Sequence, residues 1–200
     1  SALMQGLADG YFIVPVTIGD YLSHKFSEPK TDINAPEFEA AEKAVQARID
    51  KLFSVNGTKT VDSIHKKLGN IMWEYVGMAR DSEGLKKAIV EIEDLKKDFY
   101  KNVKVPGTQY EFNQELEKAL RLEDFFEIGQ LMARDALNRN ESCGGHFRIE
   151  SQTEEGEAKR DDANYMYVAA WEYKGEGVAP ELHKEPLKYE FIEVKTRNYK

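Results

Sequence analysis

Residues 82–99 read SEGLKKAIVEIEDLKKDF, and this stretch decides the fold class. Its apolar side chains recur at the three- and four-residue spacing of one helix face: Leu85, Ile89, Ile92, Leu95 and Phe99. Lysines and acidic residues alternate over the rest, which is typical of a solvated helix surface with i,i+4 ion pairs. We expect an amphipathic helix that has Ser82 as its N-cap and is closed by Pro106-Gly107.

Similar patterns lie on both sides of this stretch. One begins at Pro36 and ends at the stop signal Asn56-Gly57, and a second runs from near Thr60 to Met78. A third runs from Phe112 to about Asn138, with a candidate break at residues 122–124. Because each pattern leaves one apolar face to bury, the sequence predicts a mainly α fold, an antiparallel bundle of three to four helices.

The opening segment, residues 1–26, is apolar on most sides and contains Pro15, which predicts a kinked helix. A helix that is apolar on all sides is normally buried, and the rest of the chain is too polar to cover it. We therefore read the first residue as a cut and expect a preceding domain. No run of about 20 apolar residues, the length that spans a bilayer, is present.

The last part of the chain predicts a small β-hairpin. Residues 164–173 and 187–196 are strand-like, and the second run alternates apolar and charged side chains. The segment between Gly175 and Pro186 would then form the connecting loop.

Composition excludes some classes of partner. The formal net charge is −8, so nucleic acid and anionic membrane surfaces are not expected as direct partners. The single cysteine, Cys143, cannot form an internal disulfide and favours a reducing compartment. No Gly-rich phosphate loop follows a strand, so the chain carries no dinucleotide fingerprint of its own.

A dense group of polar residues follows the last predicted helix, and we interpret it as a domain interface. Arginines that face carboxylates often join two domains through bidentate hydrogen bonds. No general base is paired with an activated nucleophile, so no catalytic residue is expected in this segment. The interface candidates are Arg139, Glu141, Ser142, His146, Arg148, Arg160, Asp161 and Asp162.

Cys143 and His146 lie three positions apart, which would suit two ligands of one metal or a nucleophile and its base. Two ligands do not make a site, and no second pair of cysteine or histidine residues lies close to them. A structural turn is the favoured interpretation, and no metal is expected.

The order of motifs resembles the C-terminal region of the succinate dehydrogenase/fumarate reductase flavoprotein family. The most specific match is Arg139-Asn140-Glu141-Ser142, Gly144, His146-Phe147-Arg148 and then Arg160-Asp161-Asp162. Residues 71–72, 77–80, 85–89, 112–117 and 122–124 resemble earlier family motifs, and the opening residues 1–4 resemble a helix that approaches the flavin. The chain departs from the family pattern at Cys143, Gly145, Tyr165 and Val168.

The resemblance implies an oxidoreductase that interconverts succinate and fumarate with covalent FAD, while the fragment itself is structural and binds no cofactor alone. It implies three parts: residues 1–30 as the last helix of a truncated FAD-binding domain plus linker, 31–140 as the helical bundle, and 141–200 as interface loop and hairpin. Backbone groups of Ala2 and Leu3 would face the flavin.

The implied partners are the FAD-binding domain of the same chain, an iron–sulfur subunit and, indirectly, a membrane anchor subunit. The implied location is the cytoplasmic side of the inner membrane. The direction of the reaction and the type of quinone stay open.

Two other functions remain open at this point. One is a stand-alone helical-bundle interaction module without catalysis, which would bind a partner through the same arginine-rich face. The other is a thiol or metal protein built on Cys143 and His146, in which replacement of Cys143 by serine would abolish the site.

Overall fold

The computed structural model describes residues 2–195. The chain divides into two compact units, Ser1–Ala47 and Arg48–Lys200, each of which is described by itself. The division into parts at residues 30 and 140 that the sequence suggested stays a prediction. No helix in residues 2–195 combines the length and the apolar character that crossing a membrane requires.

The first unit opens with an interrupted apolar helix. Helix α1 (Ala2–Ala8) is followed by the π-helical turn η1 (Asp9–Ile13) and by α2 (Val14–Ser23). Pro15 lies in the first turn of α2, and the Val14 N–H donates to the Asp9 carbonyl five residues back. The wider turn accommodates the proline ring, which would otherwise meet the carbonyl four residues before it. The irregularity expected at Pro15 is therefore a π turn.

The apolar side chains of this helix are not buried. Leu3 is 85% exposed and Phe12 is 72% exposed. Helix α3 (Pro36–Val55) then begins at the predicted proline and ends just before the predicted Asn56-Gly57 stop signal.

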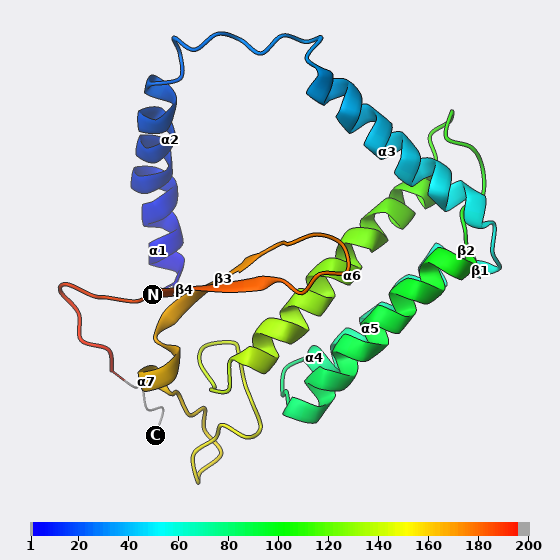
Figure 1. Cartoon of the computed structure of the whole chain (residues 1–200). Coiled ribbons are helices and arrows are strands. Elements are labelled where there is room, and N and C mark those ends of the chain that lie inside the picture. The colour runs from blue at the N-terminus through cyan, green and yellow to red at the C-terminus, as the bar shows by residue number, and fades with distance from the viewer. Residues whose placement is uncertain (1, 196–200) are drawn as a thin grey trace. The chain divides into compact units, whose positions relative to one another are not determined.

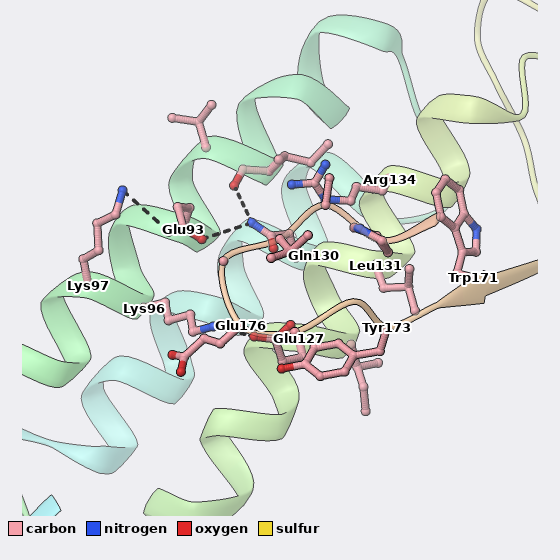
Figure 2. Close-up of a pocket in the computed structure, with 18 of the residues that line it drawn as sticks. Glu93, Lys96, Lys97, Glu127, Gln130, Leu131, Arg134, Trp171, Tyr173 and Glu176 are labelled. Atoms are coloured by element: carbon pink, nitrogen blue, oxygen red, sulfur yellow. Dashed lines mark hydrogen bonds and ion pairs between the residues drawn. The ribbon is translucent and has the colours of Figure 1, made fainter. Parts of the chain in front are cut away.

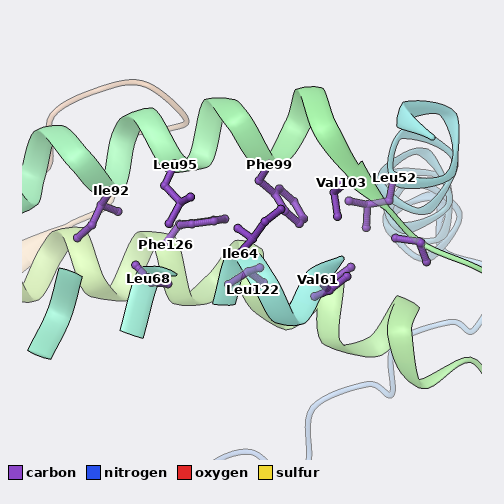
Figure 3. Packing of buried hydrophobic residues seen from close by; sticks show 12 residues of the cluster. Leu52, Val61, Ile64, Leu68, Ile92, Leu95, Phe99, Val103, Leu122 and Phe126 are labelled. Atoms are coloured by element: carbon purple, nitrogen blue, oxygen red, sulfur yellow. The ribbon is translucent and has the colours of Figure 1, made fainter. Parts of the chain in front are cut away.

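The second unit is built on an antiparallel bundle of α4 (Val61–Val76), α5 (Ser82–Asn102) and α6 (Gln114–Asn138) (Figure 1). Phe99 and Phe126 meet edge to face at its centre, with ring centroids 5.6 Å apart, and Leu52 from the end of α3 joins them (Figure 3). The predicted apolar faces of the helices supply this core, so the predicted bundle is confirmed.

Helix boundaries correct two details of the sequence analysis. The N-cap of α5 is Asp81, whose carboxylate accepts from the Gly84 N–H at 2.8 Å; Ser82 is the first helical residue, not the cap. The candidate break at residues 122–124 is also absent, because α6 runs through it with Leu122 and Glu123 buried. Packing against α4 and α5 holds this stretch helical.

A close approach of two backbones joins the ends of the bundle. Strands β1 (Lys59–Thr60) and β2 (Val103–Lys104) pair in parallel, and the Gly57 N–H donates to the Val103 carbonyl at 2.9 Å. A Cβ atom at Gly57 would lie 2.1 Å from the Asn102 carbonyl oxygen, so this position requires glycine. Asn56 adopts a positive φ of 40° just before it.

The C-terminal hairpin forms, but the second predicted strand was wrong. Strand β3 (Tyr167–Glu172) pairs antiparallel with β4 (Glu181–Pro186), with Glu172 opposite Glu181. The polar β4 lies inside the segment predicted as a loop. Residues 187–195 contain no strand although they alternate, because no partner strand lies beside them; Thr196 lies outside the described residues. The start of the first predicted strand is the short helix α7 (Asp162–Tyr165).

Candidate functional site: a buried arginine network

The loop after α6 is fastened to the bundle by Arg148, whose side chain is buried although it is charged. Its Nη1 donates to the Ala136 carbonyl at 2.9 Å, one of the last carbonyls of α6 that have no partner inside the helix. Its Nε and Nη2 donate to the two carboxylate oxygens of Glu150 at 3.2 and 3.4 Å. Positive charge at a helix C-terminus also complements the helix dipole.

Glu150 extends this connection to a second helix. One of its oxygens accepts from the Ser82 backbone N–H at 2.5 Å, at the N-terminus of α5. Burial alone would raise the pKa of Glu150, but the hydrogen bonds from Arg148 and Ser82 outweigh burial and hold that pKa below its ordinary value. The arginine and the glutamate therefore link the end of α6 to the start of α5.

Between these anchors the chain makes a tight turn. The N–H of Cys143 donates to the His146 carbonyl at 2.9 Å, and the N–H of His146 donates back to the Cys143 carbonyl at 3.0 Å. Gly144 supplies the positive φ, 59°, that the turn needs. The fully buried Ser142 hydroxyl accepts from the Arg148 N–H at 2.8 Å. This geometry is that of the structural turn favoured by the sequence.

Both ring nitrogens of His146 have partners. Nε2 lies 2.8 Å from the Arg139 carbonyl, so it carries the hydrogen, and Nδ1 accepts from Arg80 Nη1 at 2.7 Å. Burial, together with the charges of Arg80 and Arg148, holds the pKa of His146 below its ordinary value despite the opposing bond to the Arg139 carbonyl. A neutral imidazole engaged on both sides cannot form a metal site with Cys143 in this arrangement.

Arg80 belongs to the network although the sequence analysis assigned it no site role. Its Nε donates to the carbonyls of Val76 and Gly77, both at 3.1 Å, and its backbone pairs with that of Phe147 and Ile149. It thus joins the end of α4 to the same loop. The resemblance included Arg80 among the family motifs, and that was the only signal in the sequence that could have found it.

A second anchor is the ion pair of Arg139 with Glu141, at 2.8 Å. Arg139 also donates to the carbonyls of Tyr165 and Tyr167, each at 3.0 Å. The second oxygen of the buried Glu141 accepts from the Asp161 N–H at 2.8 Å. These bonds fasten α7 and the start of β3 to the end of α6.

The structure thus brings most of the predicted interface residues into one connected network: Arg139, Glu141, Ser142, His146, Arg148 and Asp161. Arg160 and Asp162 instead pair with each other, in a more exposed bidentate pair with Nε–Oδ1 at 2.9 Å. Ala2 and Leu3 lie in the first unit, at the start of α1, and their contact with a flavin stays a prediction.

The network positions segments of the chain relative to the helix ends of the bundle. Within residues 2–195, no buried side-chain nitrogen or oxygen lacks a hydrogen-bond partner. The buried charged groups of the network, such as Arg148 and Glu141, are therefore engaged with neighbouring groups and with helix ends. Fold and network together define a helical-bundle domain stabilised by a buried arginine–carboxylate network.

Comparison with known proteins gives the family. Residues 65–199 match the family model described as the C-terminal region of the fumarate reductase flavoprotein, and the chain belongs to this family. The fumarate reductase flavoprotein subunit of Haemophilus influenzae is 29% identical over 85% of this chain and 27% of its own length. That of a Serratia species is 32% identical over 78% of this chain and 25% of its own length.

Solved structures agree with this assignment. Quinol fumarate reductase of Escherichia coli superimposes with a TM-score of 0.70 at 25% identity, over 83% of this chain and 27% of that one. Sdh1 of Mycobacterium smegmatis, at 22% identity and a TM-score of 0.68 over 87% of this chain and 27% of that one, shows the same fold. The chain spans about a quarter of the length of the curated relatives it matches, with 27% and 25% covered.

Proposed function

We propose that this chain forms the C-terminal helical part of a flavoprotein that interconverts succinate and fumarate with FAD. The observation that carries the proposal is the family match across residues 65–199, which includes the whole arginine network. In this proposal the bundle and the hairpin are structural, and the hydride transfer takes place on the flavin.

The exposed apolar helix of the first unit supports a covering domain. Exposed apolar surfaces of this kind mark interaction sites in soluble proteins. We assign residues 1–30 to the end of an FAD-binding domain, 31–140 to the bundle, and 141–200 to the interface loop and hairpin. In this proposal the backbone N–H groups of the first turn of α1, at Ala2 and Leu3, would face the flavin.

The interface role of the polar cluster is part of the same proposal, and its members contribute in two ways. The buried residues, such as Arg148 and Glu141, would shape the interface by holding the loop in place. Arg160 and Asp162 keep exposed surface with which to contact the FAD-binding domain directly. The further partners are an iron–sulfur subunit and, indirectly, a membrane anchor subunit. In this proposal the chain lies on the cytoplasmic side of the inner membrane, as part of a membrane-bound complex.

A denaturing gel of the native protein from its source cells tests the proposal. An antibody raised against this chain identifies the band, and flavin fluorescence is read in the same lane. A fluorescent band far heavier than 22.9 kDa is expected, because a covalently held flavin survives denaturation. A dark band near 22.9 kDa would contradict the proposal and favour a stand-alone interaction module.

A further inference from the structure

A groove of about 730 Å³ lies between α5, α6 and the segment that connects β3 to β4 (Figure 2). Small-molecule sites in proteins commonly have volumes of about 300–1,000 Å³. All the lining residues belong to the second unit, whose helices are held by the bundle core. The groove is therefore supported by rigid elements on two sides.

The groove has an apolar wall, and one of its side chains, Ile89, also packs against the bundle core. Ile89 and Leu131 contribute from α5 and α6, and Trp171 and Val178 contribute from the hairpin side. The indole Nε1 of Trp171 donates to Asp135 at 2.8 Å, which satisfies the polar edge of the ring and fixes its orientation. The apolar wall is thus organised before any ligand arrives.

Most charges along the groove are already compensated. Lys96 forms an ion pair with Glu127, and Gln130 Nε2 donates to Glu93 at 3.3 Å. Arg134 is different: this half-buried side chain forms no ion pair or hydrogen bond with any residue in the described part of the chain. Figure 2 shows it on α6 among the lining side chains, with Trp171 coming from the strand beside it. A positive charge without a partner beside an apolar wall favours an anionic group.

We propose that this groove binds a small organic monoanion with an apolar or aromatic body. The anionic group would pair with the Arg134 guanidinium, and the body would lie against Trp171, Ile89 and Val178. Binding would bury apolar surface and at the same time give Arg134 an acceptor, which it lacks among residues 2–195.

The other charges along the groove limit the ligand to one negative charge. The lining contains one more carboxylate than cation: Glu93, Asp94, Glu127 and Glu176 against Lys96, Lys97 and Arg134. A second anionic group would face these carboxylates without a free cation, so small dicarboxylates are excluded.

The two tryptophans of the chain allow a direct test by NMR on the nitrogen-15-labelled protein. Trp171 lines the groove, whereas Trp73 is 82% exposed on α4 and does not. Phenylacetate is the probe, with phenylacetamide as its neutral analogue and succinate as a dianion. We expect the chemical shift of the Trp171 indole N–H to change saturably with added phenylacetate, and that of the Trp73 indole N–H to stay unchanged. Equal movement of both signals, or none for Trp171 at millimolar phenylacetate, would overturn the proposal.

Two variants on the same helix separate charge from surface effects. Arg134→Gln should raise the Kd for phenylacetate about ten-fold, because one charge-assisted contact is lost. Arg134→Lys should recover part of the affinity. Arg121→Gln is the matched control, because Arg121 pairs with Glu117 on α6 outside the groove, and it should bind as the parent does. If Arg134→Gln bound phenylacetate as tightly as the parent does, Arg134 would not belong to the site. The same would follow if the parent bound phenylacetamide as tightly as phenylacetate. Each variant is shown to be folded if its spectrum, away from the substituted residue, matches that of the parent.

Discussion

Replacing Arg148 by methionine tests whether the buried network stabilises the fold. Methionine keeps the aliphatic stem but removes the donors to Ala136 and Glu150. A lost hydrogen bond of a charged group costs about 1.5–3 kcal/mol, and a buried carbonyl left without a donor costs about 1–3 kcal/mol more. The Glu150 side chain is 39% exposed, so water can solvate part of the carboxylate once the arginine is lost. We expect the free energy of unfolding to fall by about 3–4 kcal/mol, below the upper limit for a broken buried ion pair.

Urea denaturation followed by circular dichroism measures this change, and Arg160→Met is the control. The pair of Arg160 with Asp162 is more exposed, with side chains 24% and 43% accessible. Its loss should cost at most about 1 kcal/mol. The reasoning fails if Arg148→Met costs less than about 1 kcal/mol, or if the two variants lose the same stability.

Three further changes test other parts of the structure. Lowering the pH below about 6.5 should destabilise the parent more than His146→Gln. The folded state holds the pKa of His146 low, so below the ordinary histidine pKa the unfolded chain takes up a proton more readily than the folded chain does, which favours unfolding. Equal pH profiles of thermal unfolding for the two proteins would contradict this. Gly57→Ala should cost about 2 kcal/mol or more in urea unfolding, since its Cβ would lie 2.1 Å from the Asn102 carbonyl oxygen, and a neutral result would mean that the backbone there moves freely. Cys143→Ser should leave stability and metal content unchanged, because the turn is made by backbone bonds; metal that is retained after dialysis of the parent and lost in the variant would revive the metal hypothesis.

Helix periodicity was the strongest signal in the sequence. The spacing of Leu85, Ile92 and Phe99 predicted α5, and these three side chains are buried in the structure. The cap was misplaced by one residue because Asp81 and Ser82 are both good capping residues and stand side by side. The periodicity of α5 was therefore read correctly, to within a residue at its start, whereas the candidate break at residues 122–124 of α6 was wrong.

The strands were harder to predict because pairing decides them. The alternation of residues 187–195 looked like a strand, yet Phe191 is 88% exposed and has no strand beside it. Strand β4 is mostly polar and forms because β3 lies next to it. The two-residue pair of β1 and β2 is too short to leave any periodic signal.

The polar cluster was predicted as a group, but its bonds could not be predicted from the sequence. The sequence indicated that Arg139, Glu141 and Arg148 belong together, and the structure gives each of them partners inside the chain. Arg80 lies 66 residues from its partner His146, so no local pattern connects the two. Networks of this kind depend on the tertiary fold, which brings distant segments to the same helix ends.

The long sequence separation of these bonds also has a consequence for the order of folding. The contact between Ser82 and Glu150 closes a separation of 68 residues, and that between Arg80 and His146 closes 66. The ends of α4, α5 and α6 that the loop binds exist only once the bundle has formed, so the loop is expected to dock after the rate-limiting step. Loss of Arg148 should therefore accelerate unfolding and leave the refolding rate nearly unchanged, which makes the network a determinant of how long the native state persists.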